Sequence, residues 1–203
     1  MTPLLRYLYP NLLWSTSSPS VHLTFDDGPH PGSTPRLLEL LRKHNVLATF
    51  FIIGKNALAH PELVRDIKAQ GHVIGNHSFS HSRLLFRNPA FVSEEIRRAD
   101  DILGAILNEK QIFFRPPYGH LSPSIIKTAH DHNHSIAMWS IDSRDFKSHS
   151  GASVAERVRR RANPGSIILF HDNEATKSIL METVSRTIDL LQQNGLGFAA
   201  LPA

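Results

Sequence analysis

The polar residues that could carry out catalysis follow short apolar runs of the sequence. The first pair, Asp26 and Asp27, comes directly after the apolar run 21–25 and directly before Gly28-Pro29. Two adjacent carboxylates repel one another, so both ionise readily only beside a cation, which can be a metal ion or an arginine. Taken alone, the segment also fits an ordinary Asp-Gly turn; residues further along the chain favour the cation site.

Two histidines supply the other half of a metal site. His77 and His81 lie four positions apart, in a turn that follows the apolar run 72–74. With one carboxylate of the aspartate pair they make three protein ligands, the number that catalytic zinc uses while one position stays open for water. Non-haem iron oxygenases use the same set of ligands. We expect Asp27 to be the carboxylate ligand, which leaves Asp26 as a base beside the metal-bound water.

Three further groups follow later strands and complement this site. The guanidinium of Arg115 can pair with Asp26, keep it ionised and orient it. His171 is the remaining group that could donate a proton near pH 7, and Asp145 is a suitable partner to hold its tautomer and raise its pKa. The alternatives without catalysis are an ordinary ion pair at the rim for Arg115 and a capping or surface His-Asp pair for His171.

Other polar clusters carry no predicted chemistry. His130, His132 and His134 fall at the end of a helix and have no acidic partner fixed by spacing, so we expect them in a solvated loop. The basic run 157–161 is expected to form a solvated helix face. No cluster of Lys and Arg is interleaved with aromatic residues, which argues against nucleic-acid binding.

The elements that must position these residues alternate between strands and helices. One helical pattern begins near residue 34, and five others cover 61–70, 92–107, 123–129, 152–161 and 174–193. This alternation predicts an α/β fold with a parallel sheet, and about seven strands suit a closed or nearly closed barrel whose strands share one active-site face at their carboxyl ends. The expected strands are 21–25, 48–53, 72–74, 112–114, 135–139, 166–170 and 197–201.

Length and composition predict a single domain over residues 1–203, with 1–20 as an N-terminal arm. Of the 203 residues, 41% are hydrophobic and 20% charged, as in ordinary globular proteins. No window holds the roughly 18 apolar residues of a membrane span. The absence of cysteine excludes disulfides and thiolate ligands. We expect a monomer. The N-terminus has no convincing signal peptide, so a cytoplasmic protein is the default expectation, with action at the cell envelope or after secretion left open.

In five places the sequence resembles the polysaccharide deacetylases, carbohydrate esterase family 4 with its NodB-homology domain. The resemblance extends from Val21 to the C-terminus and includes a departure at Phe146, where the family usually has tryptophan. It implies that the fold is a distorted (β/α) barrel of about seven parallel strands. The matching segments are Thr24–Pro29, His77–His81, Arg115–Tyr118, Asp142–Phe146 and Leu169–His171.

The resemblance also implies a role for each matched residue. Asp26 would be the general base, oriented by Arg115, and His171 the catalytic acid, supported by Asp145. The substrate would contact four residues, among which the Tyr118 amide helps to hold the oxyanion, Leu169 lines the acetyl pocket and Phe146 forms one wall of it. The implied metal ligands are Asp27, His77 and His81, and the implied substrate-binding residues are Tyr118, Pro116, Leu169 and Phe146.

The implied activity is metal-dependent hydrolysis of N-acetyl groups on glycans that contain N-acetylglucosamine, such as chitin oligosaccharides or peptidoglycan, with release of acetate. One divalent metal is expected, Zn²⁺ with Co²⁺ or Ni²⁺ as substitutes. The same chemistry on acetyl-xylan esters or on a small amide or imide is the alternative. A non-catalytic glycan-binding protein is less favoured because no catalytic residue is missing. An iron oxygenase is disfavoured because such enzymes usually have an all-β jelly-roll fold.

Overall fold

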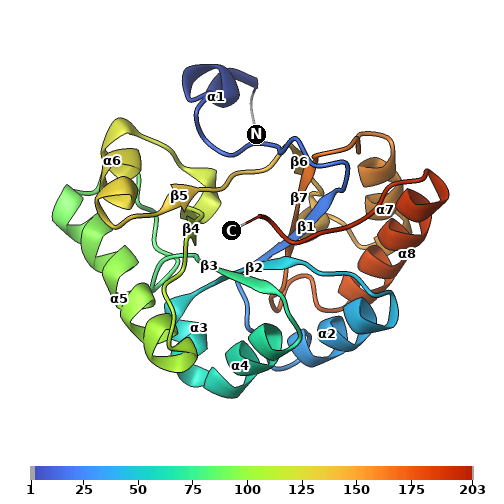
Figure 1. The fold of residues 1–203 in the computed structure, drawn as a ribbon, viewed down its shortest axis with the longest axis horizontal. Coiled ribbons are helices and arrows are strands. Elements are labelled where there is room, and N and C mark those ends of the chain that lie inside the picture. Colours follow the sequence, from blue (N-terminus) through green and yellow to red (C-terminus); the bar gives the residue numbers. More distant parts are fainter. Residues whose placement is uncertain (1–2, 203) are drawn as a thin grey trace.

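A computed structural model describes residues 3–202, in which parallel strands form one sheet curled into a half-barrel (Figure 1). The strand order is β5-β4-β3-β2-β1-β7-β6, so the α/β barrel prediction is confirmed. Every strand pair is parallel, as expected where helices connect successive strands. The strands are β1 His22–Asp26, β2 Thr49–Ile52, β3 Val73–Asn76, β4 Phe113–Phe114, β5 Ser135–Ile136, β6 Ile141–Asp142 and β7 Ile167–His171.

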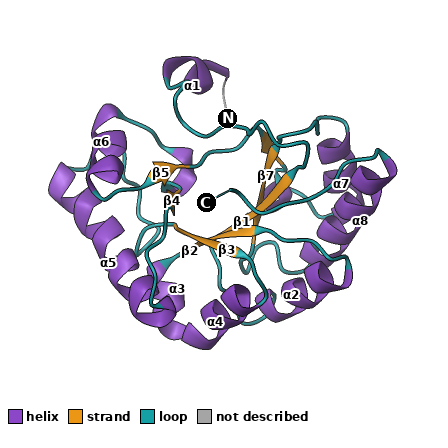
Figure 2. Ribbon diagram, in the orientation of Figure 1, coloured by secondary structure: helices purple, strands orange, loops and turns teal. Residues whose placement is uncertain are grey.

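Helices cover the outer face of the curled sheet (Figure 2). Several begin at a proline, which suits the first turn because its missing N–H would have no helical partner. Among residues 3–202, no helix is long and apolar enough to cross a membrane. The helices are α1 Pro3–Leu8, α2 Thr34–Lys43, α3 Gly54–Ala59, α4 Pro61–Ala69, α5 Pro89–Leu107, α6 Pro123–Asp131, α7 Gly151–Arg159 and α8 Leu180–Gln193, with short 3₁₀ turns η1 Pro117–Gly119 and η2 Asp145–Lys147.

The central strands are buried on both faces, and alternate side chains enter two different cores. Phe25 and Phe50 belong to the core between the sheet and the outer helices, where their ring centroids lie 5.2 Å apart. Phe51 and Leu169 point the other way, into a core inside the curl. This alternation fixes the register, because a slip by one residue would exchange the two sets of side chains. In that register Asp26 lies beside His171.

The N-terminal arm fills the gap between the two edges of the curled sheet. Leu13 pairs in parallel with Ala137, next to β5, and Ser15 pairs antiparallel with Ser166, next to β7. Between them Trp14 is buried in the inner core and donates its indole N–H to the carbonyl of Tyr9 at 2.8 Å. The arm therefore hydrogen-bonds to both sides of the opening.

Two expectations about strands are wrong. Residues 197–201 form no strand, because the segment crosses the amino ends of β1 and β2, with one bridge between Phe198 and Val21 and a hydrogen bond from Leu201 to the Thr49 hydroxyl. The second wrong expectation concerns residues 141–142, which form the seventh strand, β6, within a segment expected to be a loop.

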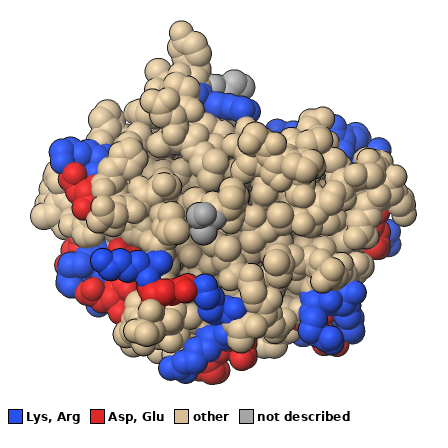
Figure 3. Space-filling view, in the orientation of Figure 1, with Lys and Arg blue, Asp and Glu red and all other residues tan. Residues whose placement is uncertain are grey.

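Figure 3 shows the face of the molecule at the amino ends of the strands. On this face the charged side chains gather at the rim, and uncharged residues cover the area inside it.

The helix limits also differ from the prediction. The last helix begins at Leu180 rather than near residue 174, because the Asn173 side chain accepts hydrogen bonds from the backbone of Ala175 and Thr176 and holds a turn there. The short helix α3 was not predicted, and at six residues it is too brief to show a clear apolar period.

Replacing Gly165 by alanine should loosen the arm. Gly165 has φ +78°, and an added Cβ would lie 2.1 Å from the carbonyl oxygen of Thr16. Gly195→Ala is the matched control, because Gly195 has φ +76° and open space around it. We expect the control to lose about 1 kcal/mol of unfolding free energy from the left-handed backbone alone. Gly165→Ala should lose at least about 1 kcal/mol more from the clash. Urea denaturation measures both, and equal losses would contradict a tightly held arm.

Candidate functional site

The strand ends bring the predicted ligands together. Asp27 follows β1, and His77 and His81 lie in the loop after β3. One candidate ligand atom from each residue lies within 4.8 Å of the other two. The structure therefore gathers into one site three residues that are up to 54 positions apart in the sequence.

One oxygen of Asp27 is left free for a cation. Its Oδ2 accepts a hydrogen bond from Asn173 at 2.7 Å, whereas its Oδ1 is buried and has no hydrogen-bond partner among the described residues. That Oδ1 lies 3.2 Å from Nε2 of His81 and 3.6 Å from Nε2 of His77. A buried carboxylate oxygen without a partner is costly, and a cation at this point would satisfy it.

The two histidines can offer lone pairs to that cation. Nδ1 of His77 lies 2.7 Å from the carbonyl oxygen of Arg115, which can only accept, so Nδ1 carries the proton and Nε2 of the neutral ring has a lone pair. Burial lowers the pKa of His81 and so favours its neutral ring. Burial alone would raise the pKa of Asp27, but the adjacent imidazoles of His77, His171 and His81 lower it below the usual range. This set of donors fits a divalent cation such as zinc.

Asp26 is held beside the ligands by a fully buried arginine. Nη1 of Arg115 donates to Oδ1 of Asp26 at 2.7 Å and to the Thr24 hydroxyl at 2.8 Å. Its Nε and Nη2 donate to the carbonyls of Ala137 and Met138. Burial lowers the pKa of Arg115, and the Asp26 carboxylate opposes this. The other oxygen of Asp26 lies 3.7 Å from Nε2 of His77, so the carboxylate borders the ligand cluster.

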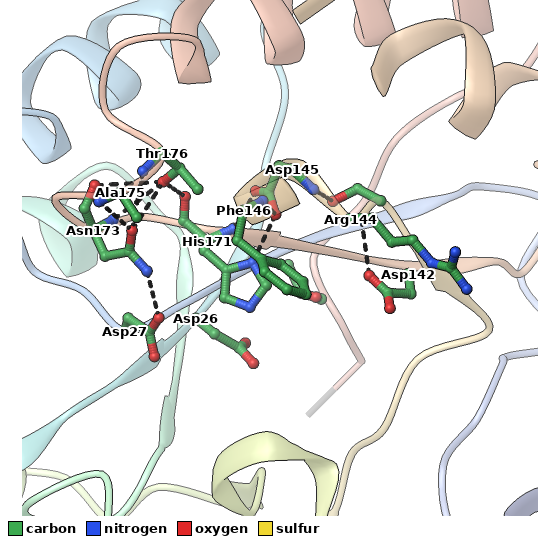
Figure 4. Close-up of polar contacts among 12 residues, drawn as sticks. Asp26, Asp27, Asp142, Arg144, Asp145, Phe146, His171, Asn173, Ala175 and Thr176 are labelled. Carbon is green, nitrogen blue, oxygen red and sulfur yellow. Dashed lines mark hydrogen bonds and ion pairs between the residues drawn. The ribbon is translucent and has the colours of Figure 1, made fainter. Parts of the chain in front are cut away.

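His171 is paired with Asp145, as Figure 4 shows. Nδ1 of His171 donates to Oδ1 of Asp145 at 2.7 Å, and the backbone N–H of His171 donates to the other oxygen at 2.8 Å. Burial would lower the pKa of His171, but the hydrogen bond and charge of Asp145, together with the charges of Asp26 and Asp27, raise it to about 9. In Figure 4 the imidazole lies between Phe146 and the two aspartates, so a proton on its Nε2 is available at the site.

The four predicted substrate-binding residues differ in exposure. Tyr118 is 53% exposed and its ring centroid lies 4.7 Å from that of His81. Phe146 is 46% exposed and meets the ring of His171 edge-on. Leu169 and Pro116 are buried. Two exposed aromatic rings therefore flank the polar centre, while the other two residues lie beneath its surface.

Sequence reasoning missed two residues of the loop after β7. Asn173 holds the second oxygen of Asp27, and its position two residues after His171 was the available signal. Asp172 is fully buried, and burial raises its pKa. Its carboxylate accepts hydrogen bonds from the hydroxyls of Ser33 and Thr34, which ties the β7 loop to the start of α2.

The expectation of a solvated loop is wrong for His134, whereas His132 lies in a turn and is partly exposed. His134 is 3% exposed, and its Nε2 lies 2.9 Å from a carboxylate oxygen of Asp100 on α5. Nε2 of His132 lies 2.7 Å from the hydroxyl of Ser93. Both partners lie at least 34 positions away in the sequence, so local spacing could not reveal them.

Comparisons with known proteins agree with this geometry. A family model described as polysaccharide deacetylase matches residues 15–137. A peptidoglycan-N-acetylglucosamine deacetylase of Bacillus cereus is 37% identical over 184 residues, which cover 90% of this chain and 67% of the relative. A chitooligosaccharide deacetylase of Azorhizobium caulinodans is 40% identical over 154 residues, 75% of this chain and 73% of the relative. The crystal structure of a peptidoglycan N-acetylglucosamine deacetylase bound to a substituted benzamide superposes with a TM-score of 0.92 at 34% identity, covering 100% of this chain and 96% of that one.

Replacing Asp145 by asparagine should lower the pKa of His171 from about 9 towards its ordinary value of 6.5. Because folding raises this pKa, the pair contributes stability fully below pH 6.5 and loses that contribution as the pH rises to 9. NMR titration of the metal-free protein measures the pKa, and urea denaturation from pH 6 to 9 measures the stability. Asp142→Asn is the control, since among residues 3–202 the Asp142 carboxylate accepts a hydrogen bond only from the backbone N–H of Arg144. An unchanged His171 titration in Asp145→Asn would contradict the pairing.

Proposed function

The chain belongs to the polysaccharide deacetylase family, and from this premise we propose that it is a metal-dependent hydrolase that removes N-acetyl groups from N-acetylglucosamine-containing glycans and releases acetate. The observation that carries the proposal is the convergence of a ligand cluster, a fixed carboxylate and a paired histidine at one end of the sheet. The relatives named above act on peptidoglycan and on chitooligosaccharides, which supports this class of substrate. We also infer a monomer with a single domain, since one chain supplies every residue of the site.

Asp27, His77 and His81 would hold the metal ion. When bound, such a cation polarises the acetyl carbonyl and makes a water molecule acidic enough to attack it. Two imidazoles and one carboxylate suit Zn²⁺ best, with Co²⁺ or Ni²⁺ able to replace it.

The remaining residues move protons and stabilise charge. Asp26 accepts a proton from the attacking water, and the hydrogen bond from the buried guanidinium of Arg115 orients it for this role. The backbone N–H of Tyr118 has no hydrogen-bond partner among the described residues and is free to donate to the developing oxyanion. His171, held by Asp145, donates the proton on Nε2 to the departing amine as the C–N bond breaks. A pKa of about 9 keeps that proton in place at neutral pH.

Acetate release from N-acetylglucosamine oligomers tests this function. We expect no release after a chelator has removed the metal, and recovery when zinc or cobalt is added back, because the carbonyl then regains its activation. Peptidoglycan fragments and acetylated xylan, assayed in parallel, identify the preferred bond. Release that survives the chelator would contradict a metal-dependent site, and release from xylan alone would move the proposal to acetyl esters.

Three variants separate metal binding from proton transfer. Asp26→Asn and His171→Ala should keep the metal and lose about 10²–10⁴-fold in kcat, the typical contribution of an acid or base. Asp27→Ala should lose the metal itself, because it removes the only carboxylate of the ligand cluster. Metal content by mass spectrometry and kcat from acetate release measure the two effects. Full turnover in Asp26→Asn or His171→Ala would exclude that residue as base or acid.

A further inference from the structure

The loop that carries His77 and His81 has a backbone that needs support. Ser78 has φ +65° and His81 has φ +57°, both in the left-handed region that costs free energy for residues other than glycine. The loop carbonyls of Ser78 and Phe79 accept hydrogen bonds from the first N–H groups of α3, those of Gly54 and Lys55. The support on the other side comes from α5.

Asn76 transmits the support from α5 to the loop. It ends β3 and is fully buried, and its Oδ1 accepts a hydrogen bond from the backbone N–H of Ser78 at 2.7 Å. Its Nδ2 donates in the other direction, to the carbonyl of Ile96 at 2.9 Å and to Oδ1 of Asp100 at 2.8 Å. Both acceptors lie on α5, so they fix which side of the amide faces the loop.

Asp100 is itself held from a second direction. Nε2 of His134, at the start of β5, lies 2.9 Å from Oδ2 and 3.1 Å from Oδ1 of Asp100. The side chain of Asp100 is 27% exposed and that of His134 only 1%. Hydrogen bonds to a carboxylate are stronger than those between neutral groups, so this anchor is stiff. No metal ligand touches either residue within the described hydrogen bonds and ion pairs.

The arrangement is poor as a device for stability alone. Nδ1 of His134 is buried and has no hydrogen-bond partner among the described residues. A half-buried carboxylate and a buried imidazole also cost desolvation free energy that an apolar pair of similar size would avoid. Residues that break the rules of a stable core are expected where function requires them.

We propose that Asp100 is a positioning residue for the metal site: anchored by His134, it sets the amide of Asn76 and thereby the loop that presents His77 and His81. The proposal rests on the metal site of the proposed function. Without the Asp100 carboxylate, Nδ2 of Asn76 keeps a single acceptor on α5, the carbonyl of Ile96, and the amide is held less firmly. The hydrogen bond from the N–H of Ser78 to that amide then weakens, and the two imidazoles are held less firmly in their relative positions.

Zinc affinity of the folded protein, measured by competition with a chromogenic chelator, tests the proposal. Outer-shell partners of metal ligands typically contribute 10–100-fold in affinity, so we expect Asp100→Ala to weaken zinc binding about 10-fold. Asp100→Asn should lose less, about threefold, because its carbonyl can still accept from Asn76. Asp101→Ala is the matched control, because Asp101 is the next residue of α5 and, within the described part of the chain, forms an ion pair only with exposed Arg97.

A double mutant tests the route through the loop. In an Asn76→Ala background, Asp100→Ala should cause no further loss of zinc affinity, whereas independent effects would add. Thermal unfolding of the metal-free variants accompanies each measurement. A purely structural role would lower the melting temperature and leave the zinc affinity of the folded protein unchanged, and that result would overturn the proposal.

Two outcomes separate this inference from the function it rests on. If the unmodified chain binds no zinc, the proposed function fails and the inference falls with it. If the unmodified chain binds zinc, Asp27→Ala does not, and Asp100→Ala binds as tightly as the unmodified chain, only the positioning role of Asp100 is excluded. If Asp100→Ala does not fold, Asp100→Asn and His134→Gln still decide the question: wild-type zinc affinity in both overturns the role.

Discussion

The structure depends on accommodating one fully buried cation. Arg115 has no exposed surface, so its charge must be neutralised and each N–H group must find an acceptor. Asp26 supplies the countercharge, and the carbonyls of Ala137 and Met138 accept two of the remaining hydrogen bonds. These acceptors come from β1 and from the chain just after β5, and Ala137 also pairs with Leu13 of the arm. The position of Asp26, the proposed base, is therefore coupled to the closure of the half-barrel.

The parallel register carries this constraint to the rest of the site. Asp26 lies opposite His171 on the neighbouring strand, so the proposed base and the proposed acid are placed by the same ladder of hydrogen bonds. The backbone carbonyl of Arg115 accepts from His77, so the residue that holds the proposed base also fixes the tautomer of a proposed metal ligand. A displacement of Arg115 would disturb proton transfer and metal binding together, which is why the site should respond as a unit.

The types of neighbouring residues and the periodicity of the apolar residues made much of the fold and the site predictable from the sequence. Carboxylates and histidines directly after apolar runs indicated the ligand cluster, and the alternation of strands and helices indicated the parallel sheet. Features that depend on distant partners could not be read from spacing: the burial of His134 requires Asp100, and the free oxygen of Asp27 is defined by Asn173. The segment 197–201 has the composition of a strand, yet it forms one bridge near the amino end of β1 and does not join the sheet. Composition does not distinguish a strand within the sheet from a segment that crosses its end.

The charges of the site also make the acid and the metal ligands interdependent. Part of the rise in the pKa of His171 comes from the charges of Asp26 and Asp27, and the rest from Asp145. A divalent cation held by Asp27 would cancel much of the field of these two aspartates, while the hydrogen bond with Asp145 would stay. The pKa of His171 should therefore be lower in the metal-loaded protein than in the metal-free protein, and the hydrogen bond with Asp145 limits that fall. In the proposed mechanism, the bound cation would thus adjust the acidity of His171 as well as that of the water.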